Sequence, residues 1–495
     1  MSVSFNNIPA NIRVPLFYAE VDNSQANTAQ EVQRTLLIGQ KLAAGTAVAD
    51  TLQFVSTTDD AKTLYGKGSH LARMHAAARA VDPFGEIWCI GIADANGTAA
   101  TGTLALTGPA TGAGTINLYI AGQKIAVAVA SGDTATAIGD AIAAAVNAET
   151  ELPVTAANVT GTVTFTARQK GTLGNDIKLQ LNYRGLAGNE SLPAGLAGTI
   201  TAMASGATDP TLTAAISAMG DELFDFIIHP FNDSTSLDAL KTLMNDTAGR
   251  WSYLKKIYGH CYTAKRGSGG ALVSFGSGRN DQHHTICGIE ANMPTPVWEV
   301  AAAYGQRNAV FLRADISRPT QTGELVGVLP APAGSRFTIS EKQSLLENGI
   351  ATQTYGGGAV RIERAITTYQ KNASNQADDS YLDSEDMHKI AYVLRDLEGV
   401  ITSKYGRAAL ANDGTRFGAG RVVVTPSIAR SEIIARCYAL EELGLLENIE
   451  VMKKYLVVER SGSNRLNVLF PPDFVNGLRI FALIAQFRLQ YPANA

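Results

Sequence analysis

The glycine-rich stretch 267–278 is the part of this sequence that most closely suggests ligand chemistry. It reads GSGGALVSFGSG and follows a predicted strand, as a phosphate-binding loop would. In such a loop a Lys and a Ser or Thr after the last glycine contact phosphate and Mg²⁺, but Arg279 and Asn280 stand here. We therefore favour a turn or a close helix–helix approach. An α/β enzyme that binds a phosphate-bearing ligand at 267–278 is kept as an alternative.

Histidine and cysteine pairs could bind a metal, but their spacing is unsuitable. His283 and His284 are adjacent on a predicted strand, as are His260 and Cys261. Neighbouring strand residues point to opposite faces of a sheet, so neither pair converges on one ion. No metal site is predicted.

A run of acidic residues precedes a predicted helix and is the last candidate for chemistry. Its members are Asp378, Asp379, Asp383, Glu385 and Asp386. A calcium loop needs glycine at its sixth position, where Leu382 and Asp383 stand instead. We expect these carboxylates to complement the positive N-terminus of the helix, or to form an acidic face for a basic partner. Two-carboxylate catalysis stays open in principle, but no catalytic, cofactor-binding or metal residue is predicted, and we expect no enzyme.

Composition excludes several classes of protein. The chain has 495 residues, enough for about three domains. Its net charge of −4 does not suit direct nucleic-acid binding, and no stretch reaches the ~18 apolar residues of a membrane span. Residues 1–9 lack the pattern of a secretory signal, and four scattered Cys are expected to be free thiols.

Residues 95–205 differ from their surroundings and predict an inserted, mostly-β domain. Only 11 of these residues are charged and three are aromatic. Residues 115–129 predict two strands around a turn at Gly122, and 133–148 predict one helix with apolar residues four apart. Further strands are expected at 159–167 and 176–183.

The flanking residues 34–94 and 206–330 predict one layered α/β core, because strands and helices alternate there. The strand expected at 86–92 would place the insert between itself and the helix at 212–219. A helix over 57–80 should be split by Gly66-Lys67-Gly68.

Residues 331–476 predict a C-terminal α+β domain that ends in a hairpin, and 477–490 predict a final strand. A long amphipathic helix is expected from Met387 to Ile401, and Thr425-Pro426 opens another. Strands at 455–459 and 465–470 flank the turn Ser461–Asn464. On the final strand, residues 481, 483, 485, 487 and 489 share one apolar face.

The N-terminal residues 1–33 contain a short apolar strand pattern followed by a polar linker. Ile12, Val14, Leu16 and Tyr18 alternate with period two, which predicts a strand with one buried face. Such a strand pairs either within its own subunit or by addition to a neighbour, and the pattern favours neither.

The chain resembles the tail sheath proteins of contractile bacteriophages, most closely the Mu-like branch. The resemblance is carried by Ser4–Pro9 with Arg13-Val14-Pro15, by Leu64–Ser69, by Ile87–Ile90, and by Gly477–Arg479 with Gln486–Leu489. It implies a multidomain α+β or α/β fold: a layered α/β core, an inserted mostly-β outer domain, a C-terminal α+β domain, and β-arms at both termini.

The resemblance also implies that the two arms pair with neighbouring subunits beside a hairpin of the neighbour. The donated strands would be 12–18 and 478–489, and the receiving hairpin 455–470. The interface residues implied are Ile12, Val14, Leu16 and Tyr18 of the first arm, Phe481, Leu483, Phe487 and Leu489 of the second, and Leu456, Val458, Leu466 and Val468 of the hairpin.

A sheath subunit of this kind would form a helical homo-oligomer around a tail tube and contract to drive the tube through the host envelope during genome ejection. Its partners would be copies of itself, the tail tube protein, and baseplate and tail terminator proteins. It would be assembled in the host cytoplasm as part of the virion tail, without a cofactor. A surface adhesin or array protein, suggested by the Ala/Thr/Gly-rich insert, is a third hypothesis.

Overall fold

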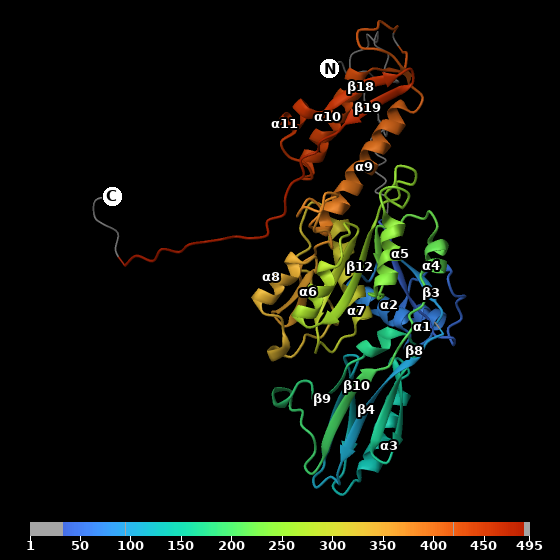
Figure 1. Ribbon diagram of the computed structural model, residues 1–495, viewed down its shortest axis with the longest axis vertical. Helices are drawn as coiled ribbons and strands as arrows, with labels where there is room; N and C mark the ends of the chain where they lie inside the picture. Colours follow the sequence, from blue (N-terminus) through green and yellow to red (C-terminus); the bar gives the residue numbers. More distant parts are fainter. Residues whose placement is uncertain (1–32, 95, 419, 490–495) are drawn as a thin grey trace, which may run out of the picture. The chain divides into compact units, whose positions relative to one another are not determined.

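The computed structural model describes residues 33–94, 96–418 and 420–489. From Arg34 onwards they belong to one unit, which contains several sheets and helices (Figure 1). The observed fold is mixed α+β with several domains, as the sequence predicts. The predicted N-terminal strand at 12–18 lies outside the described residues.

A six-stranded sheet forms the central part of this unit. Its order is β13-β12-β11-β1-β3-β2, and all neighbours are parallel except β2 and β3. The strands are β1 (Thr35–Gln40), β2 (Leu52–Phe54), β3 (Ile87–Ile92), β11 (Phe226–Ile228), β12 (His260–Gly267) and β13 (His284–Glu290). Parallel sheets are covered on both faces, which explains continuous apolar runs such as Leu36–Ile38.

Helices that connect the strands, and one that follows β13, cover this sheet. They are α1 (Thr58–Tyr65), α2 (His70–Val81), α4 (Thr213–Met219), α5 (Ser234–Met244), α6 (Gly269–Ser277) and α7 (Val297–Ala314). The predicted break between α1 and α2 is confirmed. Gly66 and Gly68 have φ of 87° and 78°, values that glycine adopts without the steric cost of a side chain.

The inserted domain is mostly β, as predicted, and lies in sequence between β3 and α4. One sheet has the order β10-β4-β8-β7 and the other β6-β5-β9. The elements are β4 (Ala99–Thr107), β5 (Gly114–Ile120), β6 (Gln123–Val129), α3 (Ala135–Ala148), β7 (Val154–Val159), β8 (Thr162–Lys170), β9 (Leu179–Leu181) and β10 (Ala197–Ala204), with short 3₁₀ turns at Thr172–Asp176 and Leu186–Gly188. Helix α3 packs on β6, β7 and β8.

Polar contacts join the insert to the central sheet. The Arg266 guanidinium lies 3.2 Å from the Asp176 carboxylate and donates to the carbonyl oxygens of Met293 and Thr295. The backbone N–H of His70 donates to Gln169 Oε1 at 2.6 Å. The apolar residues of both regions also form one continuous buried cluster.

The remaining elements follow α7. They are a 3₁₀ turn (Ala333–Ser335), α8 (Ile339–Glu347), β14 (Thr352–Gly356), β15 (Ala359–Arg364), α9 (Ser384–Tyr405), β16 (Ala409–Leu410), β17 (Val423–Val424), α10 (Pro426–Glu442), α11 (Ile449–Tyr455), β18 (Val457–Gly462) and β19 (Arg465–Leu469). The central buried cluster continues through Val360, Ile362 and Ile366, beyond the predicted domain limit at 330. That limit stays a prediction.

A second buried cluster belongs to the C-terminal helices and hairpin. Val393, Ile433, Cys437, Leu440, Leu445, Leu446, Ile449, Met452 and Leu456 form it. Among the described helices, none is both long enough and apolar enough to cross a membrane.

Candidate subunit-assembly site

The predicted receiving hairpin is present and packs against α10. Strands β18 and β19 pair antiparallel, with Val458 opposite Val468 and Arg460 opposite Leu466. In the described part of the chain neither strand pairs with a third, so both outer edges carry unpaired backbone groups. Such edges are templates for strand addition.

The four predicted hairpin residues have different surroundings. Leu456 immediately precedes β18 and is buried in the second cluster, and Val458 packs partly against that cluster. Leu466 is half-buried, but Val468 is 46% exposed although it lies on the same face as Val458. The helices therefore cover β18 more completely than β19.

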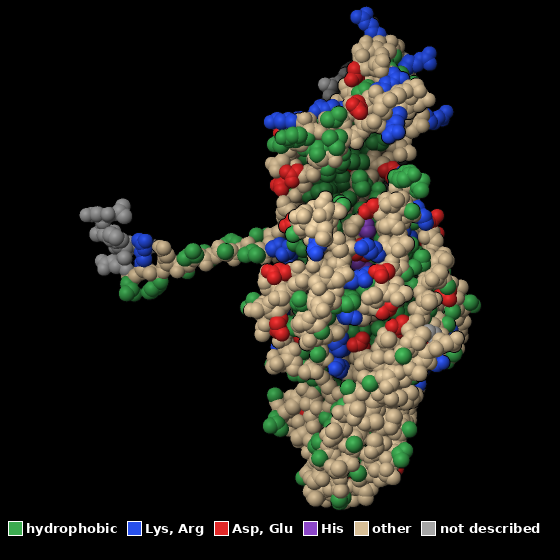
Figure 2. Space-filling model, in the orientation of Figure 1, with side chains coloured by type: hydrophobic (Ala, Val, Ile, Leu, Met, Phe, Trp, Pro, Cys, Tyr) green, Lys and Arg blue, Asp and Glu red, His purple; other side chains and the backbone are tan. Residues whose placement is uncertain are grey.

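The predicted second arm forms no strand with its own chain in the described residues. Phe481, Leu483, Phe487 and Leu489 are 80%, 76%, 88% and 93% exposed. Figure 1 draws 477–489 without helix or strand, and Figure 2 shows hydrophobic side chains along it. We call residues Ile480–Leu489 the C-terminal arm. Its pairing with a neighbour, like that of the residues at 12, 14, 16 and 18, stays a prediction.

The residues just before this arm are held by hydrogen bonds from three elements. The backbone N–H of Val475 donates to Leu445 O at 3.1 Å, and its carbonyl accepts from Lys389 Nζ at 3.0 Å. Gln321 Nε2 donates to the carbonyl oxygen of Leu478 at 3.1 Å. We call Val475–Arg479 the arm root.

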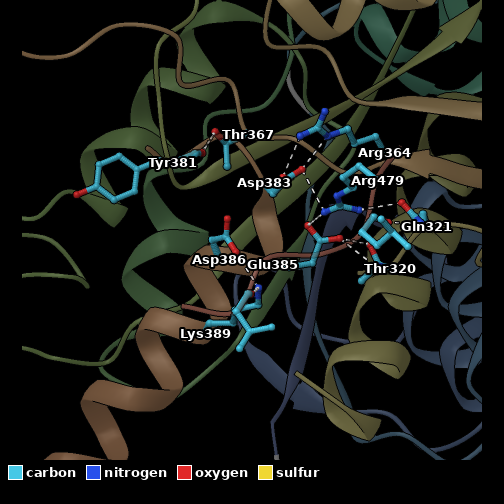
Figure 3. A network of polar contacts seen from close by, with 12 residues as sticks. Thr320, Gln321, Arg364, Thr367, Tyr381, Asp383, Glu385, Asp386, Lys389 and Arg479 are labelled. Atoms are coloured by element: carbon cyan, nitrogen blue, oxygen red, sulfur yellow. Dashed lines mark hydrogen bonds and ion pairs between the residues drawn. The ribbon is translucent and has the colours of Figure 1, made fainter. Parts of the chain in front are cut away.

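Arg479 joins the arm root to the first turn of α9. Its guanidinium lies 3.2 Å from Asp383 Oδ1 and 3.2 Å from Glu385 Oε2, and it donates to Gln321 Oε1 (Figure 3). Glu385 is buried, and its other oxygen accepts from the N–H and hydroxyl of Thr320, both at 2.9 Å. We call Arg479, Asp383 and Glu385 the root clamp.

The end of the acidic run therefore lies at the N-terminus of α9 as predicted, with Asp383 at the N-cap and Glu385 and Asp386 in the first turn. It also meets basic groups, but these belong to the same chain. Arg364 donates two hydrogen bonds to Asp383, at 2.9 and 3.0 Å, and this pairing raises the pKa of the Arg364 guanidinium.

The glycine-rich stretch is a helix, not a loop. Ser268 caps α6 by accepting from the N–H of Ala271, and the N-terminal Gly269 faces the carboxylate of Glu341. A carboxylate at this position disfavours a phosphate. At the other end, a Cβ on Gly276 would lie 2.1 Å from the carbonyl oxygen of Asn348, just after α8. The expected close approach between helices accounts for this glycine.

The buried histidines contact one another and aromatic rings. His229 Nε2 lies 2.9 Å from His284 Nε2, and His388 Nε2 lies 3.0 Å from the hydroxyl of Tyr262. Burial lowers the pKa of His229 and His388 to about 3. Among the described residues, no group of three or more His, Cys, Asp or Glu side chains is arranged to hold a metal.

The root clamp is the part of this site that the sequence analysis did not identify. A signal was present: Arg479 is the single charged residue among the largely apolar residues 477–485. Such a charge needs a partner when it is buried, and the acidic run had no assigned cation.

Comparisons with known proteins identify the family. Three family models match: "Phage tail sheath protein beta-sandwich domain" at 95–197, "Phage tail sheath protein central domain" at 205–368, and "Phage tail sheath C-terminal domain" at 376–488. The chain is 40% identical to the Mu-like prophage FluMu tail sheath protein of Haemophilus influenzae, over 99% of this chain and 100% of the relative.

A solved structure shares the fold. The sheath tail protein of Desulfitobacterium hafniense aligns over 94% of this chain and 97% of its own, with a TM-score of 0.50 and 12% identity. The full-length relative and the three domain matches agree. This chain therefore belongs to the phage tail sheath family.

Proposed function

We propose that this tail sheath protein polymerises helically around a tail tube and that its subunits are linked by exchange of terminal strands. The observation that carries the proposal is an arm whose large apolar side chains are exposed, together with a hairpin whose two outer edges are unpaired among the described residues. Each is an aggregation hazard alone, and pairing between copies removes both hazards.

In the proposed assembly, the C-terminal arm (Ile480–Leu489), which makes up most of the predicted strand 478–489, adds to the hairpin β18–β19 of a neighbour. Residues 12–18 of another copy add to the same small sheet. The alternate residues Phe481, Leu483, Phe487 and Leu489 would then face the helices beside β19, where Val468 is exposed. Contacts of this head-to-tail kind that do not close produce a helix.

Contraction would follow from a difference in buried surface between two arrangements of the same subunits. At ~25 cal/mol per Å² of apolar area, a few hundred additional Å² per subunit amounts to several kcal/mol. Summed over the polymer, this free energy would drive the tube through the host envelope during genome ejection, and no nucleotide would be needed.

The partners proposed are further copies of the chain, a tail tube protein, and the baseplate and tail terminator proteins at the ends of the polymer. Assembly would take place in the host cytoplasm, before the tail joins the virion. A catalytic role is not proposed.

The test is removal of one strand at a time from the full chain. We expect the purified protein, alone or with its tube partner, to form tubes visible by negative stain. Deletion of residues 1–19, or of 480–495, should abolish the tubes and leave a chain with unchanged circular dichroism and unfolding midpoint. Normal tubes from either deletion would exclude exchange of that strand.

A further inference from the structure

Arg479 of the root clamp is the last residue before the C-terminal arm whose side chain is partly buried, although Leu478 before it is 68% exposed. The Arg479 side chain is 15% exposed, whereas the next residue, Ile480, is 81% exposed, and the apolar residues after it stay exposed to Leu489. The chain is thus held to its own subunit up to Arg479. From Ile480 onwards it is available to another molecule.

Helix α9 connects this boundary to the receiving hairpin. Its first turn carries Asp383 at the N-cap and Glu385, and its second half carries Leu397 and Ile401, which pack on the second buried cluster. Asp396 pairs through both carboxylate oxygens with Arg436 of α10, and α10 packs on β18. At 1.5 Å per residue, the 22 residues of α9 span about 33 Å.

The second turn and the middle of the same helix are fixed to the central sheet. His388 stacks on Phe226 of β11 with ring centroids 4.6 Å apart, and Arg395 forms an ion pair with Asp225. A single continuous helix therefore contacts the arm root, the sheet and the domain that carries the hairpin.

We propose that Arg479 is a positioning residue, which fixes the exit of the C-terminal arm to the first turn of α9. The arm that a subunit donates and the hairpin with which it receives would thereby be held at a constant separation by one helix. This inference rests on the proposed strand exchange and adds the residue that sets its geometry.

The chemistry of Glu385 explains why the clamp holds. One of its oxygens is occupied by Thr320, and the other makes the ion pair with Arg479 but accepts no hydrogen bond in the described part of the chain. If the arm root left, a buried carboxylate oxygen would lose its cation. Removing one partner of a buried ion pair is strongly unfavourable, so the closed clamp is the preferred state.

The first experiment measures the position of the arm root in the full-length, unassembled chain. Nitroxide labels are placed at Leu478→Cys, in the arm root next to Arg479, and at Ser403→Cys on α9, and both sites are exposed. The four native cysteines are buried, which limits labelling to the introduced thiols. Double electron–electron resonance then gives the distance distribution between the two labels.

The test variant is Arg479→Met with Glu385→Gln, which opens the clamp without leaving a buried charge unpaired. Arg364→Ala is the matched control, because it removes a cation from Asp383 but not from the arm root. We expect a distance distribution with one narrow maximum in the wild type and the control, and loss of that maximum in the double variant. An unchanged narrow distance in the double variant would overturn the proposal.

The second experiment images assembled tubes. We expect the double variant to form tubes without the regular layer lines of the wild type, because the arms still pair but leave their subunits at variable positions. Layer lines as sharp as those of the wild type would also overturn the inference. If the wild type itself makes no tubes, strand exchange fails, while the distance measurement still reports whether the clamp holds.

Discussion

The inserted domain and the C-terminal end of the chain both contain strands, but they differ in how many of their large apolar side chains are exposed to solvent. Among the described residues of 95–205, two large apolar side chains are exposed, Val159 and Leu186. In the much shorter segment 443–489 there are thirteen. The insert completes its core within the chain, with Phe165, Ile142 and Val163 fully buried.

This difference in exposure supports the proposal that the C-terminal region is the one that binds another molecule. A monomer rarely leaves a run of large apolar residues in water, so an uncovered run marks an interaction site. The insert tolerates low charge and many small residues because its two sheets and α3 cover one another. In the proposed assembly, the C-terminal arm and hairpin would gain the same cover from neighbouring copies.

The largest effect is expected from polar substitutions in the arm. Replacing Phe481, Leu483 and Phe487 by Ser should abolish tubes, because each buried apolar side chain contributes about 1.5–3 kcal/mol. The unassembled chain should keep its unfolding midpoint, since these side chains are exposed in it. Negative stain and urea unfolding measure the two results.

The matched control for the arm places Ser at Val159 and Leu186 of the insert, which are also exposed. Tubes should form normally. Loss of tubes in this control would mean that exposed apolar residues matter for assembly wherever they lie, and the contrast between the two regions would not hold.

The next largest effect is expected in the core of the insert. Phe165 of β8 is fully buried, so Phe165→Ala should lower the free energy of unfolding by about 3–5 kcal/mol. Phe487→Ala in the arm should change it by less than about 0.5 kcal/mol in the unassembled chain. Equal losses of unfolding free energy for the two substitutions would show that the arm is covered by its own chain.

Histidine protonation at low pH should lower the stability of the central region but not of the insert, because 95–205 contains no histidine. Burial lowers the pKa of His229 and His388 to about 3 and that of His260 and His284 well below its usual value. These groups stay neutral in the folded chain but bind protons in the unfolded chain below pH ~6.5, so stability is lost as pH falls.

At pH 5.5 each of these histidines should reduce stability by about 1 kcal/mol relative to pH 7.5. Trp88, Trp251 and Trp298 all lie outside the insert, so their fluorescence during urea unfolding follows the central region. An unfolding midpoint that does not fall between pH 7.5 and 5.5 would contradict the prediction.

The smallest effects are expected at helix caps, and they should be alike in the two regions. Thr134 caps α3 of the insert and Thr425 caps α10 beside the hairpin, each by accepting a backbone N–H. Replacing either by Ala should cost about 1 kcal/mol. A much larger loss of unfolding free energy for Thr425→Ala would mean that the C-terminal domain itself is unstable in the unassembled chain. The contrast between the regions would then not be limited to the unpaired edges of the hairpin and the exposed arm.

Local elements were predictable where a short stretch carries its own signal. The split of α1 and α2 at two glycines, the Thr425-Pro426 start of α10 and the hairpin around Ser463-Asn464 are all observed. The end of α7 at Ala314 was not predictable in the same way. Asn308, Ala309 and Leu312 continue the buried side of this helix, and the sequence pattern alone did not reveal that the neighbouring elements cover them.

The sequence by itself determined the periodicities, the turns and the contrast in composition of the insert, because these depend on residues a few positions apart. The tertiary structure decided which distant groups meet. Arg479 forms an ion pair with Glu385, and Gln169 accepts a hydrogen bond from the backbone of His70. The acidic run pairs with cations of its own chain. The physical reason is that burial, which gives an ion pair or a hydrogen bond its importance, is a property of the packed elements and not of the local pattern.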